Sequence, residues 1–481
     1  MLEPVSTGAA GPESARAQRW LEIGSLCLAV LALFALSFRY MDLLGDSFWS
    51  VATGRWILEH ASLPKTDPFS FTANRPWIVH MPLSQLCFAW IEGHFGALAL
   101  ELFGALVLGA ALLTIGLPHA RGPHARLLCF CTLALLVFLQ ADDLCVRGQL
   151  FGDWAFAVLL GCLFRLRLGK PVHPAFAVLL GALWINLHSS AFLAVLLPLG
   201  WAALLRLDRT RPAPKPFLLF AALAALGLFV NPYGVHLVVD LLRLFVASST
   251  QHIDLFRAPD FTALPTLIAF ALMAAAAAVA ILRPASGLGL PEAALLVLWA
   301  VAGASARRYL PLGAALASVV LARRASLSWP SVSSSPSARA SVLALLALAA
   351  GTAFWSLSAD KDPWRDVPLE EASLVDQLGL PDHVVNSYQW GGFLDYAWNG
   401  RRKVFVDGRN QLFEHGAFED ARRLGGLDGW SAILDRYRAN TVIWERNSPL
   451  DLALAASPAW ALVRRGRIAV LYVRKEPLPL R

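Results

Sequence analysis

The chain has 481 residues, of which 57% are hydrophobic and only 16% are charged, and its formal net charge is +7. Soluble globular proteins carry about 25% charged residues, so this composition excludes an ordinary soluble protein and is typical of a membrane protein. The surplus of positive charge lies in residues 1–357, because acidic and basic side chains are equal in number in residues 358–481. It therefore indicates membrane topology and not a nucleic-acid partner.

Several apolar runs approach the length of about 20 residues that a helix needs to cross a bilayer. They are residues 21–38, 96–117, 127–141, 150–165, 174–187, 189–205, 216–230, 262–282, 290–305, 309–322 and 340–357. The pattern predicts a polytopic α-helical membrane protein with about 11 transmembrane helices. We expect a disordered cytoplasmic N-terminus at residues 1–20, a membrane domain at 21–357 that includes a first outer loop at 39–95, and a third region at 358–481.

Short basic loops assign a side to each end of these helices. Arg16 and Arg19 precede the first run, which predicts a cytoplasmic N-terminus. If the chain then alternates, the other strongly basic loops all fall on the same side: 118–126, 166–173, 206–215, Arg283 and 323–339. The loops on the opposite side, and the C-terminal region, are predicted to be extracytoplasmic.

The first outer loop contains a predicted helix and several polar residues. Residues 47–60 have helical periodicity with an apolar and a polar face, so we expect an amphipathic helix that lies flat on the outer leaflet. Asp46 or Ser47 could cap its start. Asp46 could alternatively act as a general base or bind a metal ion. Asp67 precedes a proline, so it is either a turn former or a second site residue.

Other polar residues gather in the outer loops and junctions. Ionisable residues at membrane depth are costly and by default mark a functional site. Asn186 and His188 stand at a break between two apolar runs, where they bind a ligand or satisfy the backbone of the break. Arg307 and Arg308 stand at an outer junction, where they suit a phosphate-linked lipid or a phospholipid headgroup, and Arg147 could join them. Arg257 is a further candidate for this set.

The region after residue 357 is predicted to be a small α/β domain. Strand-like runs occur at 384–385, 403–406, 441–444 and 468–473, and helical patterns occur near 416–424, 429–438 and 449–456. The Ser/Pro-rich segment 328–339 is predicted to be a flexible linker. The chain contains no GxGxxG, GxxxxGK[ST], GxSxG or HExxH motif, so nucleotide-binding folds and common hydrolases have no support.

Three sets of residues, taken together, resemble a known family. The first runs from Asp46 through Gly54-Arg55, Leu63-Pro64, Asp67-Pro68-Phe69-Ser70 and Pro76-Trp77 to His80, the second is Leu183–His188 with Asn231-Pro232-Tyr233-Gly234, and the third is Asn386–Gly392 with Val404–Arg409. These residues resemble bacterial membrane glycosyltransferases of the GT-C type, distant relatives of protein mannosyltransferases and lipid A aminoarabinose transferases. The mannosyltransferases have adjacent acidic residues where this chain has Asp46-Ser47.

The resemblance implies a GT-C fold in the bacterial inner membrane, with an extracytoplasmic site that takes a sugar from a polyprenyl-phosphate carrier. Asp46 would be the base, with Asp67 or His80 as the second candidate. Arg307 and Arg308, helped by Arg147, would neutralise the departing phosphate. The acceptor would be an envelope glycan or protein, and the resemblance allows a divalent cation (Mg or Mn) held by Asp46.

Two other classes of function remain open at this point. A transporter or flippase for a lipid-linked or anionic substrate would use the same basic outer residues, but it would need a path to both faces. A non-catalytic envelope assembly protein would use residues 360–481 to dock partners and would not need Asp46.

Overall fold

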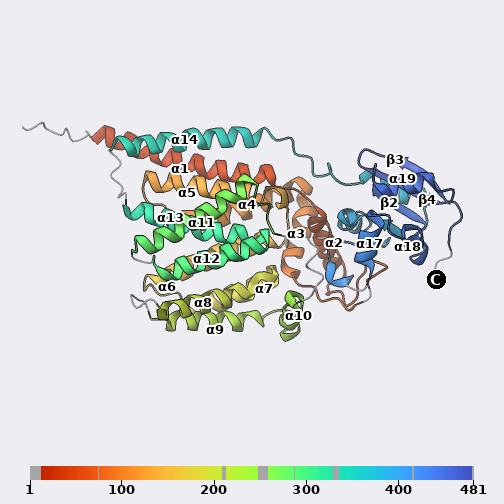
Figure 1. Cartoon of the computed structure of the whole chain (residues 1–481), viewed down its shortest axis with the longest axis horizontal. Helices are drawn as coiled ribbons and strands as arrows, with labels where there is room; N and C mark the ends of the chain where they lie inside the picture. Colours follow the sequence, from red (N-terminus) through yellow and green to blue (C-terminus); the bar gives the residue numbers. More distant parts are fainter. Residues whose placement is uncertain are drawn as a thin grey trace, which may run out of the picture.

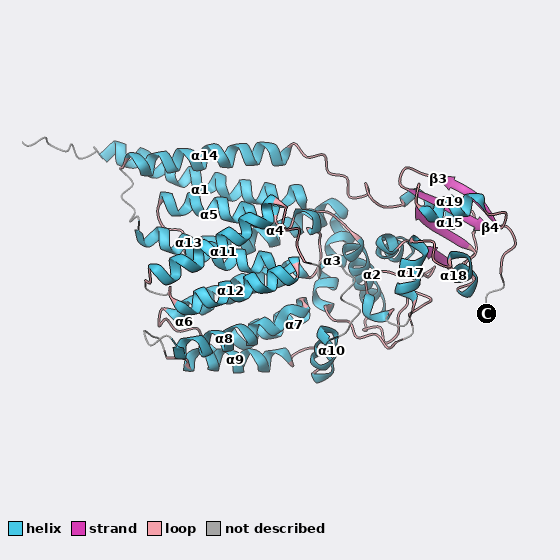
Figure 2. Cartoon of the chain, viewed as in Figure 1, coloured by secondary structure: helices cyan, strands magenta, loops and turns pink. Residues whose placement is uncertain are grey.

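The computed structural model describes residues 12–73, 75–207, 213–246, 258–285, 288–328, 335–413 and 416–478. These residues form a bundle of long helices, a group of shorter helices at one end of it, and a small sheet beyond them (Figures 1 and 2). The candidate residue Arg257 lies outside the described residues. Residues 1–20 were predicted to be disordered, but helix α1 begins at Pro12, so residues 12–20 are helical.

The bundle reproduces the predicted apolar runs, one helix for each run. Its helices are α1 (Pro12–Tyr40), α4 (Ala97–Gly116), α5 (Pro123–Phe138), α6 (Gln149–Arg167), α7 (Pro174–Leu187), α8 (Leu193–Leu207), α9 (Lys215–Leu228), α11 (Leu264–Leu282), α12 (Leu290–Ser305), α13 (Leu310–Ser328) and α14 (Pro336–Leu357). Within the described residues, seven helical segments are long and apolar enough to cross a membrane, and four further apolar helices are shorter. The chain is therefore a membrane protein, and the number of about 11 spans stays a prediction.

Two kinds of residue shape this bundle. Proline occupies the first or second position of α5, α7, α9, α11, α12 and α14, where its missing N–H costs nothing because that group has no partner within the helix. Glycine allows close packing between α7 and α9: a Cβ on Gly181 would overlap the Ala224 carbonyl, and one on Gly227 would overlap the Val178 carbonyl. Small residues at such crossings are how membrane helices gain packing contacts.

The two ends of the bundle differ. The N-terminal end of α1 and the start of α14 lie at the left in Figure 1, whereas α2 (Gly45–His60), α3 (Pro82–Phe95), α10 (Val235–Val246) and the C-terminal region lie at the right. The segments between the predicted spans that contain α2, α3 and α10 are the ones that the charge pattern assigned to the outer side. The structure thus gathers the predicted outer segments at one end of the bundle.

Helix α2 differs from its prediction. The residues from Ser47 to Gly54 are all buried, because α2 packs against both α3 and α16 (Gly391–Trp398). A Cβ on Gly54 would overlap the Gln85 carbonyl of α3. The polar side chains in the first half of α2 are therefore covered by protein, whereas Glu59 and His60 are exposed. The helix itself was predicted correctly, but its interpretation as an amphipathic helix that lies flat on the surface was wrong.

The C-terminal region contains a four-stranded sheet with the order β1-β2-β4-β3. Its strands are β1 (Val384–Asn386), β2 (Thr441–Glu445), β3 (Trp460–Arg465) and β4 (Ala469–Arg474); β1 is parallel to β2, and the other pairs are antiparallel. The helices are α15 (Leu369–Gln377), α16, α17 (Ala417–Gly425), α18 (Trp430–Arg436) and α19 (Pro449–Ala456). The α/β prediction is confirmed, but β3 was missed, and residues 403–406 form only isolated bridges.

Those bridges connect the C-terminal region to the first outer loop. Val404 pairs with both Val384 and Ser70, and its N–H donates to the Phe69 carbonyl over 2.8 Å. Phe69 and Trp77 of the loop share a hydrophobic cluster with Phe405 and other residues of the C-terminal region. The outer loop therefore packs as part of the C-terminal region, although the bundle separates the two along the chain.

Candidate functional site

The link between α1 and α2 leads directly to Asp46, the second residue of α2, and lies beside the link between α5 and α6. The N–H of Asp42 donates to the Leu144 carbonyl over 3.2 Å, and the N–H of Val146 donates to the Asp42 carbonyl over 3.1 Å. This short parallel pairing brings Arg147 next to Asp46, where the Arg147 Nη1 atom donates to Asp46 Oδ2 over 3.4 Å. Two predicted site residues 101 positions apart are thus in contact.

Asp46 does not cap α2, which was the structural alternative for this residue. The Ser47 hydroxyl accepts the Leu44 N–H over 3.2 Å instead. Asp46 Oδ1 accepts the indole N–H of Trp49 over 3.0 Å, and the side chain is 38% exposed. A carboxylate offers about four acceptor positions, so with these two contacts Asp46 can still accept a hydrogen bond from a substrate.

Two further predicted residues lie near Arg147. Burial, together with the positive charges of Arg308 and Arg147, lowers the pKa of His188 to about 3. Because of this low pKa, His188 is neutral at physiological pH. The residue stands between α7 and the short helix η2 (Ser189–Phe192). Its Nδ1 atom lies 2.7 Å from the Ser190 hydroxyl. Arg147, Arg308 and His188 thus share one region of positive charge, at the end of the bundle where the predicted outer segments gather.

Arg307 and Asn186 make contacts that were not predicted. Arg307 donates to Asp143 Oδ1 over 2.7 Å, so an acidic partner offsets part of its charge. The Asn186 amide donates to the carbonyls of Ala182 and Val230 over 2.7 and 2.8 Å. Asn186 therefore connects the ends of α7 and α9. Of the two roles that the sequence left open, ligand binding and satisfying the backbone of the break, its contacts are those of the second.

Sequence reasoning missed several residues that build this region. Asp153 in α6 interacts electrostatically with Arg147 and Arg308, and its signal was a carboxylate inside an apolar run. A Cβ on Gly152 would lie 2.7 Å from His188 Nδ1. Glycine at this position lets the His188 ring approach α6, and a single sequence gives no signal for such an approach.

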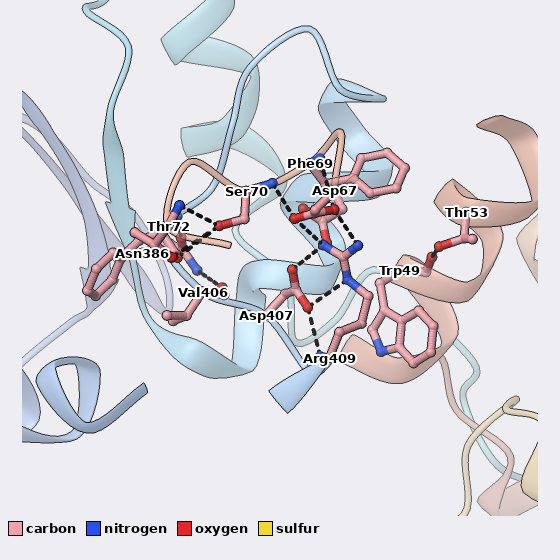
Figure 3. A network of polar contacts seen from close by, with 12 residues as sticks. Trp49, Thr53, Asp67, Phe69, Ser70, Thr72, Asn386, Val406, Asp407 and Arg409 are labelled. Carbon is pink, nitrogen blue, oxygen red and sulfur yellow. Dashed lines mark hydrogen bonds and ion pairs between the residues drawn. The ribbon is translucent and has the colours of Figure 1, made fainter. Parts of the chain in front are cut away.

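Asp67 lies in a separate and fully buried cluster (Figure 3). Its Oδ1 atom accepts from the Phe69 N–H over 3.2 Å and from Arg409 over 2.6 Å, and its Oδ2 atom accepts from the Ser70 N–H over 2.9 Å and from Arg409 over 3.3 Å. All four acceptor positions of this carboxylate are filled. Burial raises the pKa of Asp67, and the Arg409 charge opposes that rise. This geometry holds the loop in place and leaves Asp67 no acceptor position for a substrate.

His80, the other candidate for the second base, faces α10. Its Nε2 atom lies 2.7 Å from Asp240 Oδ2. The neighbouring Val79 N–H donates to the Tyr233 hydroxyl over 3.2 Å. A histidine beside a carboxylate has a fixed ring orientation, so His80 keeps the chemistry of a base, but its described contacts are with α10 and not with Asp46.

The residues around Asp46 do not fit a Mg or Mn ion. Mg²⁺ and Mn²⁺ prefer several oxygen ligands, whereas the side-chain contacts of Asp46 are two hydrogen-bond donors, Arg147 and Trp49. Among the described residues, no three His, Cys, Asp or Glu side chains are grouped to hold a metal ion. Arg147 supplies the positive charge at this position.

Neither a protein-family model nor a curated protein sequence matches the chain. Solved structures do. The oligosaccharyltransferase of Archaeoglobus fulgidus, tethered with an acceptor peptide, is 13% identical and superposes with a TM-score of 0.55, over 88% of this chain and 69% of its own. ArnT from Cupriavidus metallidurans in the apo state is 14% identical with a TM-score of 0.56, over 95% of this chain and 98% of its own.

The arabinofuranosyltransferase AftD from Mycobacteria is 14% identical with a TM-score of 0.56, over 95% of this chain and 40% of its own. This chain therefore spans less than half of AftD, but nearly the full length of ArnT. The superpositions on ArnT and AftD cover 95% of the chain, so each includes residues of the helical bundle, the outer loop and the C-terminal region. The chain has the fold of the GT-C membrane glycosyltransferases.

Proposed function

We propose that the chain is a membrane glycosyltransferase that transfers a sugar from a polyprenyl-phosphate carrier to an acceptor of the cell envelope, on the extracytoplasmic face of the bacterial inner membrane. The observation that carries this proposal is the pairing of the partly exposed Asp46 carboxylate with Arg147, next to Arg308 and the neutral His188. A base and a phosphate-binding cation are thereby adjacent at the end of the bundle where the outer loops gather.

The proposed carrier follows from the chemistry of the site and from the fold. The A. fulgidus oligosaccharyltransferase, with a TM-score of 0.57 and 11% identity, has been solved with a dolichol-phosphate and an inhibitory peptide. A guanidinium group binds phosphate through paired N–H donors, and arginines at an outer junction have no role in positive-inside topology. Arg147 and Arg308, with Arg307 alongside, are the residues that we assign to the carrier phosphate.

The reaction exchanges one bond at the anomeric carbon of the sugar. The acceptor hydroxyl gives its proton to the Asp46 carboxylate, and its oxygen forms a bond to the anomeric carbon. The bond from that carbon to the phosphate oxygen breaks, and its electron pair leaves with the polyprenyl phosphate. Arg147 and Arg308 stabilise the negative charge that develops there, which is often the largest contribution to such catalysis. Asp46 is the base in this proposal, and Asp67, whose acceptor positions are filled, is not.

The test is the Asp46→Asn substitution, expressed in a strain that lacks the native chain. The variant should insert and accumulate normally, because Asn keeps the size of the side chain and can still accept from Trp49. Mass spectrometry should show the glycan product reduced by about 100-fold or more, as expected for the loss of a general base, and the lipid-linked sugar accumulating. Asp360→Asn is the matched control, since the Asp360 side chain is 95% exposed.

The outcomes separate the proposal from the other two classes of function. Full product formation by Asp46→Asn would remove Asp46 from the mechanism. Movement of an unmodified lipid-linked substrate across proteoliposomes would indicate a transporter. A phenotype that depends only on residues 360–481, with Asp46 dispensable, would indicate an assembly protein.

A further inference from the structure

A turn of the C-terminal region, Asp407–Gly408–Arg409, lies directly against Asp46. A Cβ on Gly408 would be 2.7 Å from Asp46 Oδ1 and 3.0 Å from Trp49 Nε1. The backbone φ of Gly408 is outside the left-handed region, so a side chain here would meet no backbone strain, but the Asp46 carboxylate or the turn would have to shift to make room for it. Gly408 is therefore the place where the C-terminal region touches the proposed base.

A second segment of the C-terminal region encloses the same helical turn. A Cβ on Gly392 would overlap the Gly45 carbonyl, and a Cβ on Gly391 would overlap the Val406 carbonyl. Burial, followed by the negative charge of Asp46, raises the pKa of the Tyr388 hydroxyl, which indicates that this ring lies near the carboxylate. The first turn of α2 is thus held between residues 388–392 and 406–409.

The turn is itself rigidly anchored to the first outer loop (Figure 3). Asp407 Oδ1 accepts from the Arg409 N–H over 2.8 Å and from its Nε atom over 2.9 Å. The Arg409 guanidinium extends to Asp67 Oδ1 over 2.6 Å and lies 4.6 Å from the centre of the Trp77 ring. A bidentate ion pair with both partners buried resists displacement, so the loop, the turn and the first turn of α2 have one fixed geometry.

We infer that the Asp407–Gly408–Arg409 turn is a positioning element of the Asp46 site: it packs against one carboxylate oxygen, Oδ1, and so holds the other, Oδ2, toward Arg147. This inference rests on the proposed function of Asp46. It assigns the C-terminal region a part in the transfer reaction, and it gives the Asp67–Arg409 pair the structural role of anchoring the turn.

The first test is Gly408→Ala, with Gly425→Ala as the control, since a Cβ on Gly425 would meet no atom within 4 Å. The added methyl group must displace the Asp46 carboxylate, and misplacing a catalytic group by about 1 Å can reduce the rate by about 100-fold. We expect the glycan product of Gly408→Ala to fall by about that factor, while the purified protein binds undecaprenyl phosphate as the native chain does. Unchanged product, or loss of both binding and product, would overturn the inference.

The second test is a double-mutant cycle in thermal unfolding, which needs no activity assay. Gly408→Ala should lower the melting temperature of the native chain much more than that of Asp46→Ala, because the truncated side chain leaves room for the methyl group. If Gly408→Ala alone does not fold, the double variant should recover folded protein. An equal loss in both backgrounds, or no recovery in the double variant, would contradict the contact.

The two tests separate this inference from the proposed function. If Asp46→Asn forms product normally, the proposed role of Asp46 as the base fails even where the unfolding cycle shows coupling. If Asp46→Asn is inactive but Gly408→Ala forms product normally, the positioning role fails and the proposed function stands.

Discussion

Two aspartates of the first outer loop, Asp46 and Asp67, each pair with an arginine from a distant part of the chain. The two pairs differ in burial, in the distance between their charged atoms and in the number of hydrogen bonds that the carboxylate accepts. Asp46 is 38% exposed, and its distance to Arg147 is 3.4 Å. Asp67 is 2% exposed, and its distance to Arg409 is 2.6 Å. The Asp67 carboxylate accepts four hydrogen bonds, whereas the Asp46 carboxylate accepts two, both from side chains.

This difference indicates which of the two ion pairs contains a carboxylate that can take a proton from a substrate. A carboxylate with filled acceptor positions, removed from water, cannot take a proton from a substrate without losing its own partners. A carboxylate that is partly exposed and has one long ion pair can take such a proton. The two pairs consist of the same residue types. Burial and the number of filled acceptor positions on the carboxylate therefore distinguish the structural pair, Asp67–Arg409, from the candidate catalytic pair, Asp46–Arg147. Both pairs flank the turn that contains Gly408, because Arg409 belongs to one pair and Gly408 touches the other.

The largest effect is expected from breaking the buried pair. Arg409→Leu leaves three buried carboxylates, Asp67, Asp395 and Asp407, without their shared cation. Removing one partner of a buried ion pair typically costs about 3–5 kcal/mol, so little folded protein should accumulate. Chemical denaturation of the purified chain measures this loss. If the variant were as stable as the native chain, the cluster would have no structural role.

The partly exposed Asp46–Arg147 pair should respond in activity and not in stability. Arg147→Lys keeps the positive charge but removes the paired donors that match a phosphate. We expect transfer to fall by about 100-fold, comparable to the loss of one donor to a developing oxyanion, with a melting temperature close to that of the native chain. Mass spectrometry of the envelope glycan and thermal unfolding measure the two quantities. A large loss of stability with normal transfer would reverse the assignment of the two pairs.

A smaller effect, dependent on pH, is expected from Asp395 in the buried cluster. Burial and the neighbouring negative charge of Asp407 raise its pKa well above the ordinary value. The folded state therefore holds the Asp395 proton more strongly than the unfolded state does, and this contribution to stability is present at low pH and is lost as the pH rises toward the folded-state pKa. Asp395→Asn mimics the protonated side chain, so it should raise the melting temperature at pH 8 and change it little at about pH 4, near the unfolded pKa. The exposed Asp360→Asn serves as the control, and a destabilising effect at pH 8 would show that Asp395 is ionised.

The smallest effect is expected from His80, which pairs with Asp240 at a partly exposed position. His80→Gln should leave glycan product close to the native amount, because the described contacts of His80 are with α10 and not with Asp46. A loss as large as that of Asp46→Asn would instead make His80 the base, and the comparison would then concern Asp46 and His80.

The membrane helices were predictable because apolar length is a local property of the chain. Each of the predicted apolar runs coincides with one helix, and the predicted outer loops meet at one end of the bundle. The candidate site was only partly predictable. Asp46, Arg147, His188 and Arg308 share one region, whereas Asn186 ties helix ends and Asp67 is saturated by Arg409. The helix predicted at 47–60 is present as α2, but it does not lie on the surface, because α3 and α16 cover its first half and no local sequence pattern indicates that packing.

Composition and periodicity by themselves determined that the chain is a helical membrane protein with a small α/β region, because the cost of placing charge in lipid acts on each segment separately. Only the tertiary structure decided which polar residues meet. The contacts of Asp46 with Arg147, of Asp67 with Arg409 and of Gly408 with Asp46 each join positions more than 100 residues apart. The first contact depends on the pairing of the α1–α2 and α5–α6 links, and the other two depend on the packing of the outer loop and α2 against the C-terminal region. No single segment encodes such packing alone.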